Sequence, residues 1–193
     1  MPASRGFSRR GMGVVMFWFT AIVVVVLDQA TKVAVRHLMP LGSPSRVLIP
    51  GVLDLYRVEN TGAAFSIGEG ATWLFVICAM VAFAVACILV WSNDLPYPLV
   101  LSLGCVAGGG AGNMIDRLAM GSVTDFLATS FMDFPVFNVA DIFVTCGVAV
   151  SMLLSRTFPL TSSRAVSAVS TEAITLSVMP LFPIWTMVSA AAA

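Results

Sequence analysis

The chain has 193 residues, of which 59% are hydrophobic and only 10% are charged, and its formal net charge is zero. Soluble domains carry roughly a quarter charged residues, so this composition indicates a membrane protein. The balanced charge gives no reason to expect nucleic acid as a partner. The sequence has one histidine, four cysteines without CxxC spacing and no HExxH motif, so it offers little to bind zinc. We therefore expect neither a metal nor another cofactor.

Long uncharged runs divide the chain into four hydrophobic segments. A helix needs about 20 residues to cross roughly 30 Å of hydrocarbon. The first and last runs reach that length only if they include the adjoining polar residues, so polar side chains are expected at the ends of those helices. The predicted fold is an all-α integral membrane protein with four transmembrane helices, at about residues 13–34, 71–92, 97–117 and 138–155.

A basic cluster of Arg5, Arg9 and Arg10 precedes the first segment. A cleaved signal peptide is the alternative reading, but the apolar stretch is too long for one and ends in Asp28–Gln29 instead of a small-residue cleavage site. The cluster predicts a cytoplasmic N-terminus, and four crossings return the C-terminus to the cytoplasm. Eight of the ten acids then lie on the outer side, where we expect the chemistry: Asp28, Asp54, Glu59, Glu69, Asp116, Asp125, Asp133 and Asp141.

Two further segments lie outside the predicted helices. Residues 36–69 contain short β-branched and aromatic stretches separated by the turn signals Pro50–Gly51 and Thr61–Gly62. They predict a small antiparallel extracytoplasmic sheet between the first two helices, lying on the membrane surface. In residues 156–193, prolines interrupt a further uncharged run. This tail is either an extra hydrophobic or interfacial segment or a poorly ordered extension.

The third helix carries a glycine at every fourth position: Gly104, Gly108 and Gly112. This spacing places the glycines on one face and predicts the close approach of a neighbouring helix. A phosphate-binding loop is the alternative, but the glycines lie within a span and no Lys–Ser/Thr pair follows them.

The acids that suggest catalysis are Asp125 and Asp141, each surrounded by apolar residues. Such surroundings raise the pKa of a carboxyl group. Two carboxylates that share a water can hydrolyse a peptide bond if one is protonated and the other ionised, and their mutual repulsion enforces that division. The ordinary alternatives are a loop acid for Asp125 and a helix cap for Asp141.

Polar residues at helical spacing flank these acids. Asn113 and Arg117 are four apart and share a face, which suits either the positioning of a substrate or carboxylate or a guanidinium that extends to the interface. Asn138 is three residues before Asp141 and shares its face. Asp28 and Lys32 are four apart in the favourable order, which is typical of an ion pair at the end of the first helix.

Other mechanisms have less support in the sequence. No GxSxG motif occurs, and a serine–lysine pair would need Lys32, the only lysine, together with Ser66 or Ser122. An ion or proton pathway is the main alternative from another class, since intramembrane acids often line one. The grouping of the acids at one face, instead of through the bilayer depth, counts against it. A non-catalytic helical scaffold is the third possibility.

Five motifs in order resemble the lipoprotein signal peptidase (signal peptidase II) family. They are Asp28-Gln-Ala-Thr-Lys32, Asn60-Thr-Gly-Ala-Ala-Phe-Ser66, Gly112-Asn-Met-Ile-Asp-Arg117, Val123-Thr-Asp-Phe126 and Phe137-Asn-Val-Ala-Asp141. Each motif alone is weak, but their shared order and spacing make the resemblance specific. It covers about residues 13–155, so we expect residues 1–155 to form a four-helix peptidase domain, with 156–193 as a C-terminal tail.

The resemblance implies a multi-pass protein of the bacterial inner membrane with an active site near its outer face. It implies an aspartic endopeptidase that removes signal peptides from prolipoproteins, cutting before a diacylglyceryl-modified cysteine, with no metal. Its partners would be those prolipoproteins and the lipid bilayer, and we expect a monomer. By motif position, Asp125 and Asp141 would be catalytic. Substrate-site residues would be Asn60, Asn113, Arg117 and Asn138, while we expect supporting roles for Asp28, Lys32 and Asp116.

Overall fold

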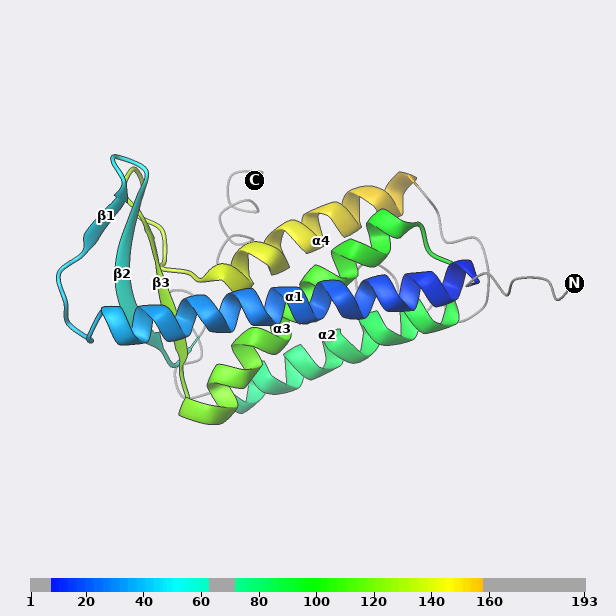
Figure 1. The fold of residues 1–193 in the computed structure, drawn as a ribbon, viewed down its shortest axis with the longest axis horizontal. Coiled ribbons are helices and arrows are strands. Elements are labelled where there is room, and N and C mark those ends of the chain that lie inside the picture. Colours follow the sequence, from blue (N-terminus) through cyan, green and yellow to red (C-terminus); the bar gives the residue numbers. More distant parts are fainter. Residues whose placement is uncertain (1–7, 63–71, 158–193) are drawn as a thin grey trace, which may run out of the picture.

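The computed structural model describes residues 8–62 and 72–157, with side chains as far as Leu154. These residues form four helices and three strands (Figure 1). In chain order they are α1 (Arg9–Leu38), β1 (Arg46–Ile49), β2 (Leu53–Asn60), α2 (Thr72–Ser92), α3 (Tyr97–Met120), β3 (Val123–Thr129) and α4 (Val139–Thr157). The predictions for residues 158–193, including a further hydrophobic segment, fall outside the described residues.

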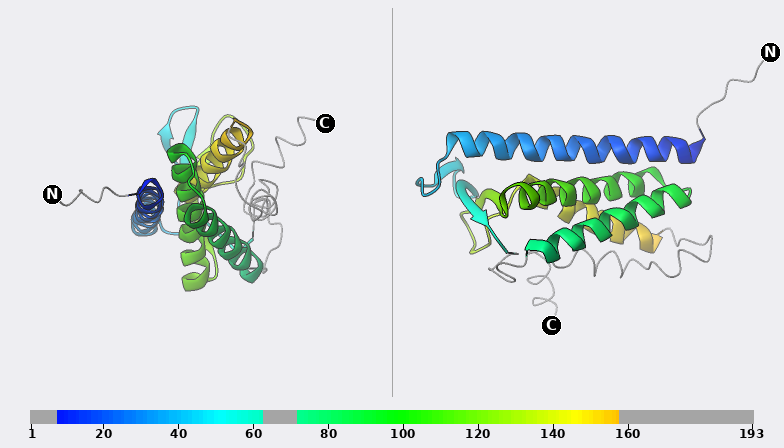
Figure 2. Two further views of the ribbon diagram at one scale, coloured as in Figure 1. Left: turned by 90° about the vertical axis from the view of Figure 1, so that its right-hand side faces the viewer. Right: turned by 90° about the horizontal axis from the view of Figure 1, so that it is seen from below.

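The helices form one elongated bundle in which α3 packs against each of the other three (Figures 1 and 2). The first residues of α1 and the last residues of α4 lie at the same end of the bundle, and the sheet lies at the opposite end. α1 is longer than its predicted span of 13–34 and continues for about 15 Å beyond Asp28 at 1.5 Å per residue. Its extra turns reach the sheet.

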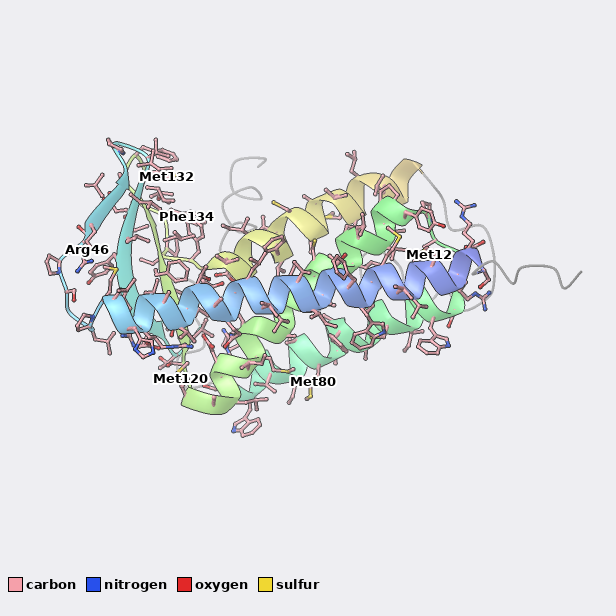
Figure 3. All side chains as sticks on the ribbon, viewed as in Figure 1. Met12, Arg46, Met80, Met120, Met132 and Phe134 are labelled. Carbon is pink, nitrogen blue, oxygen red and sulfur yellow. The ribbon has the colours of Figure 1, made fainter. Side chains whose placement is uncertain are left out.

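Three helices, α1, α2 and α3, are long and apolar enough to cross a membrane, judged by length and composition over the described residues. The apolar part of α4, Val139–Leu154, is shorter. Large apolar side chains point outward from the bundle, as Figure 3 shows for Met12 on α1 and Met80 on α2. Such a surface is too apolar for water and suits contact with lipid. The described residues thus form a mostly helical fold whose outer surface is apolar, as expected for a membrane protein.

The glycines of α3 bring two neighbouring helices into close contact with it. A Cβ atom on Gly108 would lie 2.6 Å from the carbonyl oxygen of Ala21 in α1, and Gly104 and Gly112 are similarly close to α1. The predicted close approach of a neighbour along this stripe is thus confirmed. On another face of α3, a Cβ on Gly109 would lie 2.6 Å from the carbonyl oxygen of Ala140 in α4. Gly109 therefore allows α4 to pack closely against α3, a contact that the spacing of Gly104, Gly108 and Gly112 did not predict.

The sheet is antiparallel in the order β1-β2-β3 and lies where α1 ends and α4 begins. The strands β1 and β2 occupy the predicted segment between the first two helices. The expectation that the whole sheet would lie there was wrong, because β3 follows α3 and pairs with β2. From Val123 to Leu127 every residue is buried, so β3 lacks the alternation that identifies a strand, and its partner is remote in sequence.

Apolar contacts attach the sheet to the end of the helical bundle. Val35 and Met39, at the end of α1, form a buried cluster with Phe126 and Leu127 of β3. In Figure 3, Met132 lies at the end of the sheet remote from α1, whereas Phe134 lies between the sheet and the start of α4; both belong to the connection that leads from β3 to α4. The strand that carries Asp125 is thereby held between α1 and the start of α4.

Candidate active site

Asp125 lies on β3 and its side chain points into the bundle, where the residue is only 3% exposed. Two contacts fix the strand at this point. Asp125 is paired in register with Val58 of β2. The main-chain N–H of Thr124, the preceding residue, donates to Oδ2 of Asp116 at 3.2 Å. Asp125 is therefore on a strand anchored on two sides, and not in a loop.

Asp141 lies in the first turn of α4 and forms a reciprocal cap with Asn138. The N–H of Asp141 donates to Asn138 Oδ1 at 3.1 Å, and the N–H of Asn138 donates to Asp141 Oδ2 at 3.0 Å. This is the geometry of a capping box. Asp141 Oδ1 accepts a hydrogen bond from Asn113 Nδ2 at 2.8 Å. The capping alternative thus describes a real contact of Asp141, but the carboxylate also faces the other site residues.

The side-chain amide of Asn138 links the two carboxylates. Its Nδ2 donates to Asp125 Oδ1 at 2.6 Å and to Asn113 Oδ1 at 3.0 Å. The second oxygen of Asp125, Oδ2, accepts from Asn60 Nδ2 at 2.9 Å. The structure thus brings five of the six expected catalytic and substrate-site residues into one hydrogen-bonded group: Asn60, Asn113, Asp125, Asn138 and Asp141.

Burial and the neighbouring carboxylate shape the electrostatics of this group. Burial, and secondarily the charge of Asp141, raise the pKa of Asp125 from 3.8 to about 7. Hydrogen bonds from Asn60 and Asn138 and the charge of Lys32 act in the opposite direction. Within the described part of the chain, no cationic side chain forms an ion pair with Asp125 or Asp141. Asp125 can therefore hold a proton near neutral pH.

Arg117, the sixth residue, lies at the edge of the group. Its guanidinium donates to the carbonyl oxygen of Gly62 at 3.3 Å and lies 5.0 Å from the centre of the Phe75 ring. The side chain is buried and does not extend to the interface. It joins the segment after β2 to the start of α2, beside the carboxylates.

A second polar cluster lies next to the first. Lys32 Nζ is 2.9 Å from Asp28 Oδ2 and 3.2 Å from Asp116 Oδ2, and it donates to Asn113 Oδ1 at 2.7 Å. The expected pair of Asp28 and Lys32 is therefore present, with Asp116 as an additional member. Asp116 also lies 3.6 Å from Arg36 and does not face Asp125. Asn113 connects this cluster to the carboxylates of the site.

Gln29 was not singled out from the sequence. Its Nε2 lies within hydrogen-bond distance of Asp28 Oδ2, Asp116 Oδ1 and the carbonyl oxygen of Gly112, at 3.1 to 3.2 Å. Its place inside the first quoted motif was the only available signal. Gln29 therefore joins α1 to α3 within the second cluster.

The sequence analysis also did not identify the ion pair of Arg57 and Glu59, which we call a latch because it connects three elements. Arg57 pairs with Glu59 at 2.7 Å and donates to the carbonyl oxygen of Met39, while Glu59 accepts from Ser122. The alternation of residues along a strand places Arg57 and Glu59 on one face, which was the signal that could have found the pair. The latch ties β2 to the end of α1 and to the start of β3.

The geometry gives little support to a serine–lysine mechanism or to a metal site. Ser122 donates to Glu59 at 2.9 Å, whereas the Lys32 contacts are Asp28, Asn113 and Asp116, so these two do not form a serine–lysine pair. Ser66 lies outside the described residues. In the part of the chain that the structure describes, no three His, Cys, Asp or Glu side chains are grouped to hold a metal ion.

Comparisons with known proteins show which family the chain belongs to. Residues 20–157 match the family described as Signal peptidase (SPase) II. The lipoprotein signal peptidase of Symbiobacterium thermophilum is 49% identical over 138 residues, covering 69% of this chain and 89% of that protein. The lipoprotein signal peptidase of Shouchella clausii is 40% identical over 139 residues, covering 72% and 91% respectively.

Two solved structures of bacterial membrane enzymes, determined by the in meso method, share the fold. They have TM-scores of 0.67 and 0.65 and are 28% identical to this chain. Each comparison covers 79% of this chain, and 94% and 95% of the solved chains. The sequence motifs, the matched region and the shared fold lead to one conclusion: the chain belongs to the signal peptidase II family of bacterial membrane peptidases, which act in lipoprotein processing.

Proposed function

We propose that the chain is an aspartic endopeptidase that removes signal peptides from diacylglyceryl-modified prolipoproteins, cutting before the lipidated cysteine. Asp125 and Asp141 act on one shared water. The observation that carries this proposal is the position of Asn138, whose amide contacts Asp125 while its main-chain N–H contacts Asp141. Asp125, which is buried, and Asp141, which is half-buried, thereby share one neighbour, and every group that donates a hydrogen bond to them in the described residues is an amide.

The surroundings assign a different role to each carboxylate. Asp141 accepts one N–H from the main chain and one from an amide, and it lies at the positive end of α4, so it serves as the ionised member. Asp125, whose pKa is about 7, serves as the protonated member. Asp141 takes a proton from water as the oxygen attacks the scissile carbonyl, and Asp125 donates its proton to the carbonyl oxygen.

The second half of the reaction restores both carboxyl groups. Asp141 now holds the proton from water and donates it to the leaving nitrogen as the C–N bond breaks. Asp125, now ionised, recovers a proton from the hydroxyl group of the tetrahedral intermediate as the new carboxyl group forms. The substrate amides and carbonyls are aligned by the neighbouring polar side chains Asn60, Asn113, Arg117 and Asn138, with Arg117 acting through its contact with Gly62.

The arrangement in the membrane follows from the same assignment. All four helices cross the bacterial cytoplasmic membrane, with the N-terminus in the cytoplasm and the sheet on the outer face. The carboxylates at the sheet end of the bundle then meet a substrate whose acyl chains hold its cleavage site near the bilayer surface. Residues 1–155 form the peptidase domain, and it acts as a monomer.

Cleavage of a purified substrate tests this function. The wild-type protein in detergent is incubated with a diacylglyceryl-modified prolipoprotein, and the shortened product is measured. Asp125→Asn and Asp141→Asn should each lower the rate by about 10³-fold or more without loss of membrane insertion. Asp133→Asn, which changes an exposed acid in the connection before α4, is the matched control and should cleave normally.

Two results would overturn the proposal. One is wild-type turnover by either variant of the dyad. The other is loss of cleavage in EDTA that zinc restores, since the two carboxylates act without a metal. A proton pathway would show itself differently, as dissipation of a pH gradient in proteoliposomes by wild-type protein that cleaves nothing.

A further inference from the structure

The two residues that precede the proposed catalytic aspartates are held by one polar cluster. The main-chain N–H of Ala140, next to Asp141, donates to Asp28 Oδ1 at 3.0 Å. The main-chain N–H of Thr124, next to Asp125, donates to Asp116 Oδ2 at 3.2 Å. The start of α4 and the strand β3 are thus each attached, one residue away from the reacting group, to a carboxylate of the second cluster.

Lys32 joins these two attachments. Its ammonium group lies between Asp28 Oδ2 and Asp116 Oδ2, at 2.9 Å and 3.2 Å, and all three side chains are almost completely buried. Removing the Lys32 charge would leave two buried carboxylates facing one another. Since like charges repel strongly in such surroundings, the two attachments would move apart.

The same ammonium group also sets the orientation of an amide in the site. An ammonium can only donate, so its bond to Asn113 at 2.7 Å requires the amide oxygen to face Lys32. The amide nitrogen of Asn113 then faces Asp141 Oδ1, to which it donates at 2.8 Å. Lys32, together with the Asn138 amide that donates to the same oxygen at 3.0 Å, therefore determines which Asn113 atom Asp141 meets.

The backbone around the cluster leaves the Asp28 side chain little room to move. Gly112 lies directly against Asp28, and a Cβ atom there would be 2.5 Å from Asp28 Oδ2. This contact fixes how closely the Asp28 side chain of α1 approaches the backbone of α3. If the cluster only neutralised charge, Asp28 and Asp116 would not need to accept the main-chain N–H groups of Ala140 and Thr124.

We propose that the ion-paired cluster of Asp28, Lys32 and Asp116 is a positioning device that holds Asp125 and Asp141 at their working separation. This inference rests on the proposed function. Lys32 maintains the spacing between the two backbone attachments and the orientation of Asn113, and none of the three residues touches the substrate. The cluster acts on kcat, because it governs the geometry of the reacting groups and not the binding of the lipid-modified peptide.

A double variant tests the device while keeping its charge. Lys32→Met with Asp28→Asn leaves the cluster with a net charge of −1, as in the wild type, and keeps an oxygen for each N–H. The expected result is a folded protein with KM within about twofold of wild type and kcat lower by about 10²-fold, the loss that misplacing a reacting group by 1 Å can cause.

The pH profile of this double variant separates positioning from general damage. Asp125 faces Asp141 of α4, Lys32 of α1, Arg117 of α3 and the amides of Asn60 and Asn138. Losing the Lys32 charge raises the pKa of Asp125, so the alkaline limb of kcat should move to higher pH. A matched control is Ser102→Ala, which breaks the buried hydrogen bond to Ser151 of 2.8 Å between α3 and α4. Ser102→Ala should lower the free energy of unfolding without shifting the alkaline limb of the kcat profile.

Two variants at Asp116 give a second test that leaves Lys32 paired with Asp28. Asp116→Leu removes the acceptor for Thr124 and should lower kcat at unchanged KM. Asp116→Asn retains an acceptor and should recover most of that loss. The Asp116 pair decides the matter if the double variant does not fold.

The outcomes distinguish the two proposals. Wild-type kcat and pH profile in the double variant and in Asp116→Leu, with an active wild-type enzyme, would overturn the positioning role and leave the peptidase intact. Losses that simply follow the Tm, as in Ser102→Ala, would also overturn it. A wild-type protein that cleaves no prolipoprotein would overturn both.

Discussion

Two pairs of aspartates lie side by side in this bundle, and they differ in what surrounds them. Asp28 and Asp116 are bound to the ammonium group of Lys32. Asp125 and Asp141 are bordered by neutral amides, from Asn60, Asn113 and Asn138. A cation cancels charge and holds geometry, whereas an amide satisfies the oxygens without cancelling their charge. The first pair is therefore suited to structure and the second to proton exchange.

The largest expected effect is on stability, and it comes from the cation of the first pair. Lys32→Met alone removes the partner of two buried carboxylates, which should lower the free energy of unfolding by about 3–5 kcal/mol. Chemical unfolding in detergent measures the loss. Asp141→Asn, which removes a charge from the pair without a cation, should cause no comparable loss. Equal stability of Lys32→Met and wild type would remove the distinction between the pairs.

Asp125→Asn should stabilise the protein at alkaline pH. The folded-state pKa of Asp125, about 7, lies above its ordinary value of 3.8. Its contribution to stability is therefore complete below pH 3.8 and is lost as pH rises through 7. Asparagine cannot ionise, so the variant should gain about 1–3 kcal/mol over wild type at pH 8 and much less at pH 5. A gain of the same size at both pH values would contradict the titration.

The pH dependence of cleavage sharpens the comparison further. In the proposed mechanism Asp125 must hold a proton to act as the acid, and its pKa is about 7. Above that value kcat should fall by about tenfold per pH unit, with an apparent pKa that belongs to the coupled pair. Initial rates at saturating substrate between pH 5 and 9 measure the limb. A flat profile across this range would show that neither carboxyl group exchanges a proton in the rate-limiting step.

The smallest expected effect concerns the neutral donor of the first pair. Gln29→Ala removes an amide within 3.1 to 3.2 Å of three acceptors, which should lower the free energy of unfolding by about 1 kcal/mol. Gln29→Glu adds a third carboxylate at the same place and should cost more. If the two substitutions destabilise equally in thermal unfolding, charge is not what distinguishes this cluster.

Much of the architecture could be predicted from the sequence because hydrophobic length and glycine spacing are local signals. The uncharged runs indicated the helices, and Gly104, Gly108 and Gly112 indicated a close neighbour, which is α1. The strand β3 could not be predicted, because its first five residues are buried on both faces and it pairs with a segment more than 60 residues earlier. Short runs of that kind have no diagnostic period.

The candidate site was predictable as a set of residues but not as a set of contacts. Helical spacing placed Asn113 and Arg117 on one face, yet Asn113 donates to Asp141 while Arg117 donates to Gly62. Asp116 was assigned a supporting role without a partner, and its partners include Lys32 and the N–H of Thr124. These contacts depend on how α1 packs on α3 and where β3 begins, which no local pattern contains.

The length of α1 has a consequence for how a substrate could arrive. Asp28 lies level with the first turn of α4, because it accepts the N–H of Ala140. Beyond that level α1 continues for about 15 Å. In the proposed membrane orientation, a peptide dissolved in water would have to pass along this extension of α1 to be cut, whereas a lipid-tethered chain that diffuses in the bilayer would already be at the depth of the site. Cleavage would thus be restricted to membrane-anchored chains by the height of the scaffold, before any side chain reads the sequence of the substrate.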